Sequence, residues 1–437
     1  MKNYLRTTGC PCGRPHHAAI DEVVVGKGVI RQIPALLERY GARRPFILAD
    51  VNTYAAAGET LCRILQEHGI PYSTYIFPQT ELEPDEHAVG AAVMHFDHTC
   101  DLIISVGSGV INDIGKILSN ISGRKYFIVG TAPSMDGYAS GTSSMSMDGL
   151  KTSLNSHCAD VIIGDIDILK NAPDHLLKTG LGDMLAKYIS IAEWRIGHLI
   201  TGEYYCEEVA QLIRGALKKC VDNAAGLLKR DEEAIQAVFE GLVIGGIAMA
   251  YAGVSRPASG VEHYFSHIWD MRGLQFGTKV DLHGIQCAIG TAQAVKLYEH
   301  VATVRPDAQK AAAYVENFDY GAWSTELREF LGASAETVIA LEGKEGKYNK
   351  QTHEARFHRI AENWDTILQI IQEELPSYQT VREIMNTIGI PENPEFLDID
   401  NTCLKQTFRA TKDIRDKYVL SRLAWDLGIL EELCDLL

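Results

Sequence analysis

Three separate stretches of this chain contain residue types that could form a metal centre. His263 and His267 are four residues apart, so on a helix their side chains share one face. His283 follows in Val280-Asp-Leu-His-Gly284, and Asp183 lies upstream in Gly180-Leu-Gly-Asp-Met. Two imidazoles and a carboxylate can hold one divalent cation and leave a coordination position for substrate. One of His263 and His267 can then bind metal while the other handles a proton. Taken singly, each of these residues is more often a hydrogen-bonded core residue. The metal-site prediction therefore depends on their combination with a nucleotide-binding half upstream.

A glycine-rich turn upstream predicts a nucleotide-binding half. Gly107-Ser-Gly109-Val-Ile-Asn-Asp113 lies where the apolar strand Leu102–Val106 would turn into a helix. Glycines there let the backbone approach a pyrophosphate, and the following helix offers N–H groups and its positive dipole end. A G-x-G alone is a weak signal, and a plain tight turn is the frequent alternative. The strand before it and the helix after it are the context that favours the nucleotide.

Asp50 ends an earlier expected strand, Phe46–Asp50. A carboxylate at this place can accept hydrogen bonds from the adenosine ribose and would repel a 2′-phosphate, which favours NAD over NADP. The alternative has equal weight: Asp50 caps the next helix near Thr53.

The loop after the strand Tyr126–Gly130 contains several small hydroxyl side chains and one carboxylate. It runs Thr131-Ala-Pro-Ser134-Met-Asp136-Gly-Tyr-Ala-Ser140. Such a loop could line a nicotinamide and a polar substrate, or form a set of Asx and Ser turns.

The elements that position these residues fall into two classes. From Glu22 to about Asp165, short β-branched runs alternate with amphipathic runs, which predicts strands joined by helices in a mostly parallel sheet. From Asn171 onward, helical periodicity dominates. We therefore predict a Rossmann-like α/β domain over residues 1–168 and an all-helical domain over 169–437, with a cleft between them. The expected strands are 23–26, 46–50, 72–77, 102–106 and 126–130, and the expected helices include 30–40, 53–68, 85–96, 204–228, 232–249 and 355–374.

Composition narrows the class of protein. With 437 residues there is room for two full cores, and a formal net charge of −16 argues against nucleic acid as a partner. No apolar run reaches the roughly 18 residues of a membrane span, and no signal segment is evident. The scattered cysteines fit a reduced cytoplasmic protein. One motif stands out, Cys10-Pro-Cys12-Gly-Arg-Pro-His-His17, which looks like half of a zinc site. No second cysteine pair with ligand spacing follows, and an N-terminal turn is the more frequent alternative.

Taken together, these motifs resemble the sn-glycerol-1-phosphate dehydrogenase family, and its bacterial members in particular. That family belongs to the metal-dependent type III alcohol dehydrogenases, together with glycerol dehydrogenase and dehydroquinate synthase. The resemblance covers roughly residues 20 to 300, and its most specific part is Ser255-Arg-Pro-Ala-Ser-Gly-Val-Glu-His-Tyr-Phe-Ser-His267. The sequence departs from the wider superfamily at Ser108, where a third glycine is frequent. The chain is also long for the family, and the additional residues lie among the C-terminal helices.

The resemblance implies roles for particular residues. Asp183, His263 and His283 would bind one divalent metal, Zn²⁺ or Ni²⁺, and Asp136, Asp183 and His267 would act on the substrate. Lys187 and Arg256 are candidates for its phosphate, with a salt bridge as the alternative at either position. The residues implied to contact NAD, or NADP in its place, are Asp50, Gly107, Gly109, Val110, Ile111, Asn112, Asp113, Thr131, Ala132, Pro133, Ser134 and Ser140.

The activity implied is the reversible reduction of dihydroxyacetone phosphate to sn-glycerol 1-phosphate by a cytoplasmic homodimer. The metal would act as a Lewis acid, and His267 would titrate near neutral pH as a proton donor or relay. Glycerol dehydrogenase is the nearer alternative. A sugar-phosphate cyclase of the dehydroquinate synthase type is disfavoured, because its first ligand is typically Glu. A NAD-binding regulatory protein would lack a ligand, and none is missing.

Overall fold

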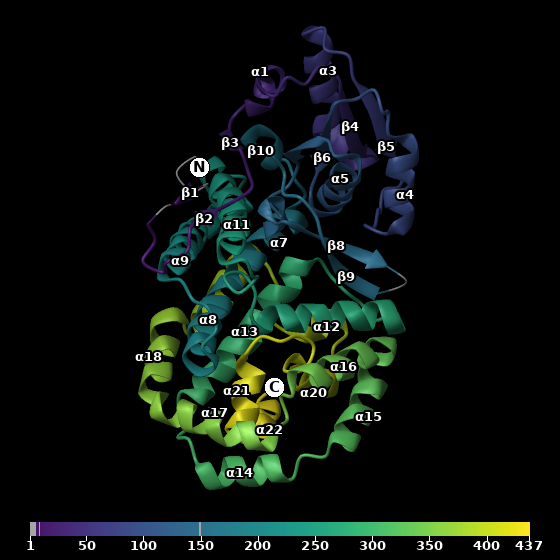
Figure 1. Cartoon of the computed structure of the whole chain (residues 1–437). Coiled ribbons are helices and arrows are strands. Elements are labelled where there is room, and N and C mark those ends of the chain that lie inside the picture. Colours follow the sequence, from purple (N-terminus) through teal and green to yellow (C-terminus); the bar gives the residue numbers. More distant parts are fainter. Residues whose placement is uncertain (1–5, 8, 148–149) are drawn as a thin grey trace. The chain divides into compact units, whose positions relative to one another are not determined.

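The structure is a computed structural model that describes residues 6–7, 9–147 and 150–437 (Figure 1). The chain forms two compact units by packing. The N-terminal unit comprises Met1–Met184 and Glu208–Val254, and the C-terminal unit comprises Leu185–Glu207 and Ser255–Leu437. The predicted division at residue 168 follows the change of secondary structure, whereas this one follows packing.

A six-stranded parallel sheet forms the centre of the N-terminal unit. Its order is β3-β10-β7-β6-β4-β5, and every neighbouring pair is parallel. β4, β6, β7 and β10 are almost wholly buried, as expected of strands covered on both faces. The strands are β3 (Glu22–Gly26), β4 (Pro45–Asp50), β5 (Ser73–Phe77), β6 (Leu102–Gly107), β7 (Lys125–Gly130) and β10 (Val161–Asp165).

The helices of this unit connect and cover the strands. The expected helix at 53–68 is continuous but contains a π-helical turn, η3, between α2 and α3. The bounds are η2 (Val29–Gln32), α1 (Ile33–Arg39), α2 (Val51–Thr53), η3 (Tyr54–Gly58), α3 (Glu59–Glu67), α4 (Glu86–His95), α5 (Gly109–Ser122), η4 (Asp136–Ala139), α6 (Ile166–Leu169), α7 (Asp174–Leu185), α9 (Glu207–Asp222), α10 (Ala224–Leu227) and α11 (Glu232–Ala252).

Three strand features were not predicted. β10 was read only as the end of the α/β pattern, although its Val161-Ile-Ile run is the apolar signature of an inner strand. The antiparallel pair β8 (Thr142–Met147) and β9 (Leu150–Asn155) is rich in Ser and Thr and has only a weak hydrophobic alternation. The short pair β1 (Arg6–Thr7) and β2 (His16–His17) encloses the Cys10–Cys12 motif.

Helix α11 is long and apolar enough to pass a test for a membrane span by length and composition. It is mostly buried within the N-terminal unit, where it packs against η4, α6 and β3. A buried core helix passes the same test, so this is weak evidence for a membrane.

The C-terminal unit is helical throughout the part that the structure describes. Predicted helix 355–374 is in fact two helices, α17 and α18, which meet at Asn363. The bounds are α8 (Lys187–Thr201), α12 (Val261–Phe276), α13 (His283–Val301), α14 (Ala308–Glu316), α15 (Tyr320–Leu331), η5 (Gly332–Ser334), α16 (Ala335–Glu345), α17 (Lys350–Glu362), α18 (Trp364–Glu374), α19 (Tyr378–Ile388), η6 (Pro394–Leu397), α20 (Asn401–Thr411), α21 (Leu420–Asp426) and α22 (Leu430–Asp435).

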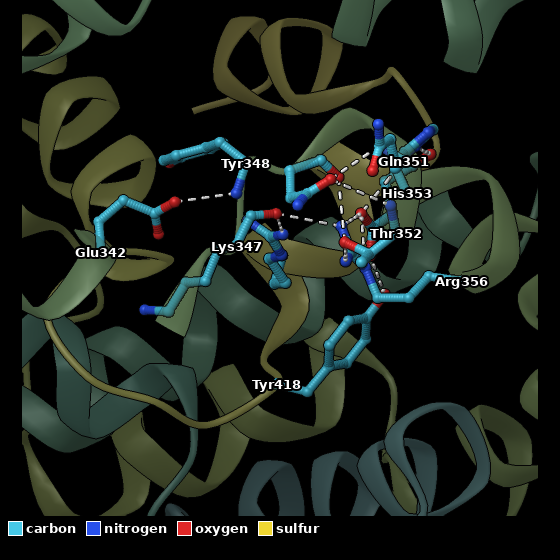
Figure 2. Close-up of polar contacts among 11 residues, drawn as sticks. Glu342, Lys347, Tyr348, Gln351, Thr352, His353, Arg356 and Tyr418 are labelled. Carbon is cyan, nitrogen blue, oxygen red and sulfur yellow. Dashed lines mark hydrogen bonds and ion pairs between the residues drawn. The ribbon is translucent and has the colours of Figure 1, made fainter. Parts of the chain in front are cut away.

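A buried polar network in this unit joins α17 to α21 and to the loop before α21 (Figure 2). Asp426 lies at its centre, because its carboxylate accepts hydrogen bonds from Tyr418 Oη at 2.8 Å and Arg356 Nη2 at 2.9 Å. His353 Nε2 lies 2.9 Å from the Asp426 carbonyl. Charge-assisted bonds of this kind fix the loop before α21, which includes Tyr418.

Candidate functional site

Three imidazoles from two adjacent helices gather in the C-terminal unit. His263 and His267 are on α12, and His283 is the first residue of α13. The ring centroids of His263 and His283 are 4.9 Å apart, and His267 stacks on His283 at 5.9 Å. Potential ligand atoms of His263, His283 and Cys287 all lie within 4.8 Å of one another. This donor set fits a divalent transition metal.

Hydrogen bonds orient both predicted histidine ligands. His263 Nδ1 lies 2.8 Å from Glu262 Oε1, and His283 Nδ1 lies 2.9 Å from Ser266 Oγ. Gln286 Nε2 in turn donates to Ser266 Oγ at 3.1 Å. Metal-binding histidines usually have such partners on the second ring nitrogen, which fixes the tautomer. A metal would therefore be bound through Nε2 of each ring.

His267 is in a different electrostatic state from the one expected. Burial, followed by the neighbouring His283 and His263, holds the pKa of His267 well below its usual value. The prediction that it titrates near neutral pH is therefore wrong, because a neutral imidazole is favoured there. A neutral ring still accepts a proton at one nitrogen while it donates from the other.

Asp183, the third predicted ligand, lies in the N-terminal unit on α7. It is fully buried, and its Oδ2 accepts a hydrogen bond from the backbone N–H of Asp136 at 3.0 Å. This hydrogen bond connects Asp136 and Asp183, which are both predicted to face the substrate. Gly180 allows this arrangement, since a Cβ there would lie 1.7 Å from the Pro133 carbonyl oxygen.

The glycine turn joins β6 to α5 as predicted, and its two glycines differ in what they permit. A Cβ at Gly107 would lie 2.5 Å from Ile111 Cβ, so packing itself demands glycine there. A Cβ at Gly109 would meet only Met135 Cγ at 3.5 Å, an ordinary contact. Protein packing therefore does not explain glycine at position 109, whereas close approach of a ligand would.

The loop from Thr131 to Ser140 is held by a buried cation that sequence reasoning missed. Lys116 Nζ donates to the carbonyls of Gly137 at 3.3 Å and Thr142 at 2.5 Å, and pairs with Asp113 at 2.8 Å. Asn112 Nδ2 also donates to the Gly137 carbonyl, at 3.1 Å. The side chains of Asn112 and Lys116 thus position the loop, and Asp113 pairs with Lys116. The available signal was the spacing Asp113-x-x-Lys116 on a predicted helix.

The remaining predicted cofactor residues belong to the glycine turn, the start of α5 and the loop from Thr131 to Ser140. Ser108 and Ser134 are joined by a short hydrogen bond between their hydroxyls, and Thr131 N donates to the Gly107 carbonyl at 3.1 Å. Ser140 Oγ bonds Thr142 Oγ1 at 2.9 Å. The other members are Val110 and Ile111 on α5, and Ala132 and Pro133 on the loop. Their contacts with NAD stay predictions.

Asp50 caps the helix that follows it. Its Oδ1 accepts from Thr53 N at 2.8 Å, and Thr53 Oγ1 accepts from Asp50 N at 3.0 Å, which forms a capping box. The capping alternative is therefore present in the structure, and the ribose contact stays a prediction.

The two predicted phosphate-binding cations are both buried in the C-terminal unit. Arg256 forms a paired salt bridge with Glu203, with Nε 2.7 Å from Oε2, and donates to the Tyr418 carbonyl at 2.9 Å. Lys187 Nζ donates to the Ala258 carbonyl at 3.2 Å. Lys417, which was not predicted, donates to the neighbouring Ser259 carbonyl at 2.8 Å. These cations fix the segment before α12, and their contact with a phosphate stays a prediction.

Two buried carboxyl groups meet at the start of α12. Glu193 Oε2 accepts from Val261 N at 2.9 Å, and Glu262 Oε1 accepts from Gly260 N at 2.7 Å. Burial raises the pKa of both, and the Glu262 charge raises that of Glu193 further. The pair therefore retains a proton at pH values where an exposed carboxyl would be ionised.

Comparison with known proteins relates the chain to the iron-containing alcohol dehydrogenases. Residues 24–173 match the model of the iron-containing alcohol dehydrogenase family. Glycerol dehydrogenase from Schizosaccharomyces pombe shares the fold, with a TM-score of 0.61 and 14% identity over 95% of this chain and 90% of that chain.

Similarity to curated proteins is more specific. Glycerol-1-phosphate dehydrogenase (NAD(P)+) of Halalkalibacterium halodurans is 33% identical over 297 residues, 67% of this chain and 74% of that protein. The Geobacillus thermodenitrificans protein of the same name is 27% identical over 409 residues, 92% of each chain. The chain belongs to the glycerol-1-phosphate dehydrogenase family.

Proposed function

We propose that this protein catalyses the NAD(P)-dependent, reversible reduction of dihydroxyacetone phosphate to sn-glycerol 1-phosphate. The observation that carries the proposal is the oriented pair His263 and His283 in a chain 33% identical to a glycerol-1-phosphate dehydrogenase. Asp183 is the proposed third ligand. Zn²⁺ or Ni²⁺ is the proposed ion, and ferrous iron would accept the same ligands.

Each proposed component of the site has a defined task. The divalent cation would polarise the ketone and stabilise negative charge on its oxygen. The nicotinamide would supply the hydride, with the pyrophosphate held against Gly109 at the amino end of α5. His267 would pass a proton to the substrate oxygen as a neutral relay, and Asp136 would orient the substrate hydroxyls.

The substrate phosphate requires cations. Lys187 and Arg256 remain our candidates, although the contacts of Arg256 with Glu203 favour a positioning role for it. Lysine at position 187 is the sharper test, because its replacement leaves the pair formed by Arg256 and Glu203 intact. Lys187→Met should raise KM for the phosphorylated ketone far more than KM for NADH.

The assay compares dihydroxyacetone phosphate with unphosphorylated dihydroxyacetone by NADH oxidation, after chelation and re-addition of zinc or nickel. Metal-dependent turnover of the phosphate ester alone is the expected result. Turnover of the unphosphorylated ketone would reassign the protein as a glycerol dehydrogenase, and silence with both would reopen the cyclase alternative. Oxidation of sn-glycerol 1-phosphate but not sn-glycerol 3-phosphate would establish the product's chirality.

The proposal includes a homodimer that works in the cytoplasm without a membrane or nucleic-acid partner. The family resemblance supports the dimer, and the net charge of −16 supports the absence of nucleic acid. Light scattering of the purified chain measures its mass directly.

A further inference from the structure

The segment between β1 and β2 folds into a tight turn that aims two thiols at one imidazole. Gly13 N donates to the Cys10 carbonyl at 3.0 Å, and Gly13 has a φ of 77°, which glycine adopts without strain. Arg14 N points at Cys12 Sγ from 3.5 Å. A backbone N–H directed at a sulfur stabilises negative charge on it, as an outer partner does for a metal-bound thiolate.

Three potential ligand atoms converge in this turn. Cys12 Sγ lies 3.4 Å from His16 Nε2, and the ligand atoms of Cys10, Cys12 and His16 are all within 4.8 Å of one another. Sulfur and nitrogen bound to one tetrahedral zinc stand about 3.5 Å apart, given bond lengths of ~2.3 and ~2.1 Å. Cys10 and His16 are buried, and His17 beside them is exposed. The observed spacing is therefore that of zinc ligands.

His16 also connects this turn to helix α11 of the same unit. The His16 ring stacks on Tyr251, with 5.0 Å between centroids.

We propose that Cys10, Cys12 and His16 bind a structural zinc ion that is separate from the catalytic metal. Two thiolates and one imidazole supply three of the four positions of a tetrahedral zinc site. Soft sulfur ligands favour zinc over magnesium, calcium or manganese. The ion would fasten the segment over residues 9–17, in which β2 packs on α11. This role is independent of the proposed activity.

The test uses the full chain, purified under reducing conditions, with zinc measured by atomic emission. Cys10→Ser and Cys12→Ser should each lose one equivalent of zinc and melt at a lower temperature. His17→Ala and Cys403→Ser are the matched controls and should retain wild-type zinc. Asp183→Ala should retain the thiolate-bound zinc whatever its activity, which separates this site from the catalytic one.

A second measurement needs no variant of the turn. Stepwise addition of a mercurial to the wild-type chain should release one zinc in proportion to the first thiols titrated. The cobalt-loaded protein should show thiolate-to-cobalt charge-transfer absorption that persists in Cys287→Ser. Absence of that absorption, or wild-type zinc in Cys12→Ser, would overturn the site.

Discussion

The two units prepare their parts of the proposed reaction by different physical means. In the N-terminal unit, glycines, small hydroxyls and backbone carbonyls shape the loops around Gly107 and Thr131. In the C-terminal unit, buried ionisable side chains surround His263 and His283. We therefore expect variants of the loops around Gly107 and Thr131 to fail sterically. We expect variants around His263 and His283 to fail through metal content and pH.

Removal of a ligand should have the largest effect. In His263→Ala we expect loss of the catalytic metal and a fall in kcat/KM of about 10³-fold or more, because a metal supplies several kcal/mol of transition-state stabilisation. The measurement combines metal analysis with NADH oxidation. His267→Ala is the matched variant and should keep metal while it loses most of the rate. Full metal content and full activity in His263→Ala would contradict the assignment of His263 as a metal ligand.

The paired glycines test the shape-based half. Gly107→Ala should lower the free energy of unfolding by about 1–3 kcal/mol, because its Cβ would overlap Ile111. Gly109→Ala should leave stability nearly unchanged and raise KM for NADH about tenfold, equal to about 1.4 kcal/mol. Denaturant titration and steady-state kinetics separate the two. Equal behaviour of both variants would show that position 109 is glycine for packing alone.

A further expected effect is a difference in pH dependence. The raised pKa of Glu193 means that the folded protein binds more protons than the unfolded chain above the ordinary carboxyl pKa. The stabilisation is thus present at low pH and is lost as pH rises toward the folded-state pKa, at up to about 1.4 kcal/mol per unit. Relative to Glu193→Gln, wild type should lose stability between pH 5 and pH 8, because the pKa of Glu193 is raised to about 8 in the folded protein. Parallel stability curves would contradict this.

Much of the shape-based unit could be predicted from sequence, because its signals are local. The run Leu102–Val106 followed by glycines predicts both β6 and the turn, and the structure has them where expected. The hairpin β8–β9 was not predicted in this way, because Ser and Thr dominate its strands and leave only a weak apolar alternation.

The charge-based unit was only partly predictable. The spacing of His263 and His267 placed both on one helix, as observed. The partners of Arg256, namely Glu203 and the Tyr418 carbonyl, are 53 and 162 residues away in sequence. No local pattern reports such pairings, and the depressed pKa of His267 likewise depends on burial that only the fold creates.

The buried ion pair under the Thr131–Ser140 loop has a consequence for how this family can change over generations. Lys116 is fully buried and the Asp113 side chain is 16% exposed, and loss of one partner from a buried pair costs about 3–5 kcal/mol. Joint replacement by apolar residues leaves no stranded charge and is far less costly. A lineage that alters one position is therefore under immediate pressure to alter the other. The two should be inherited as a unit, and neighbouring positions on α5 should drift independently of them.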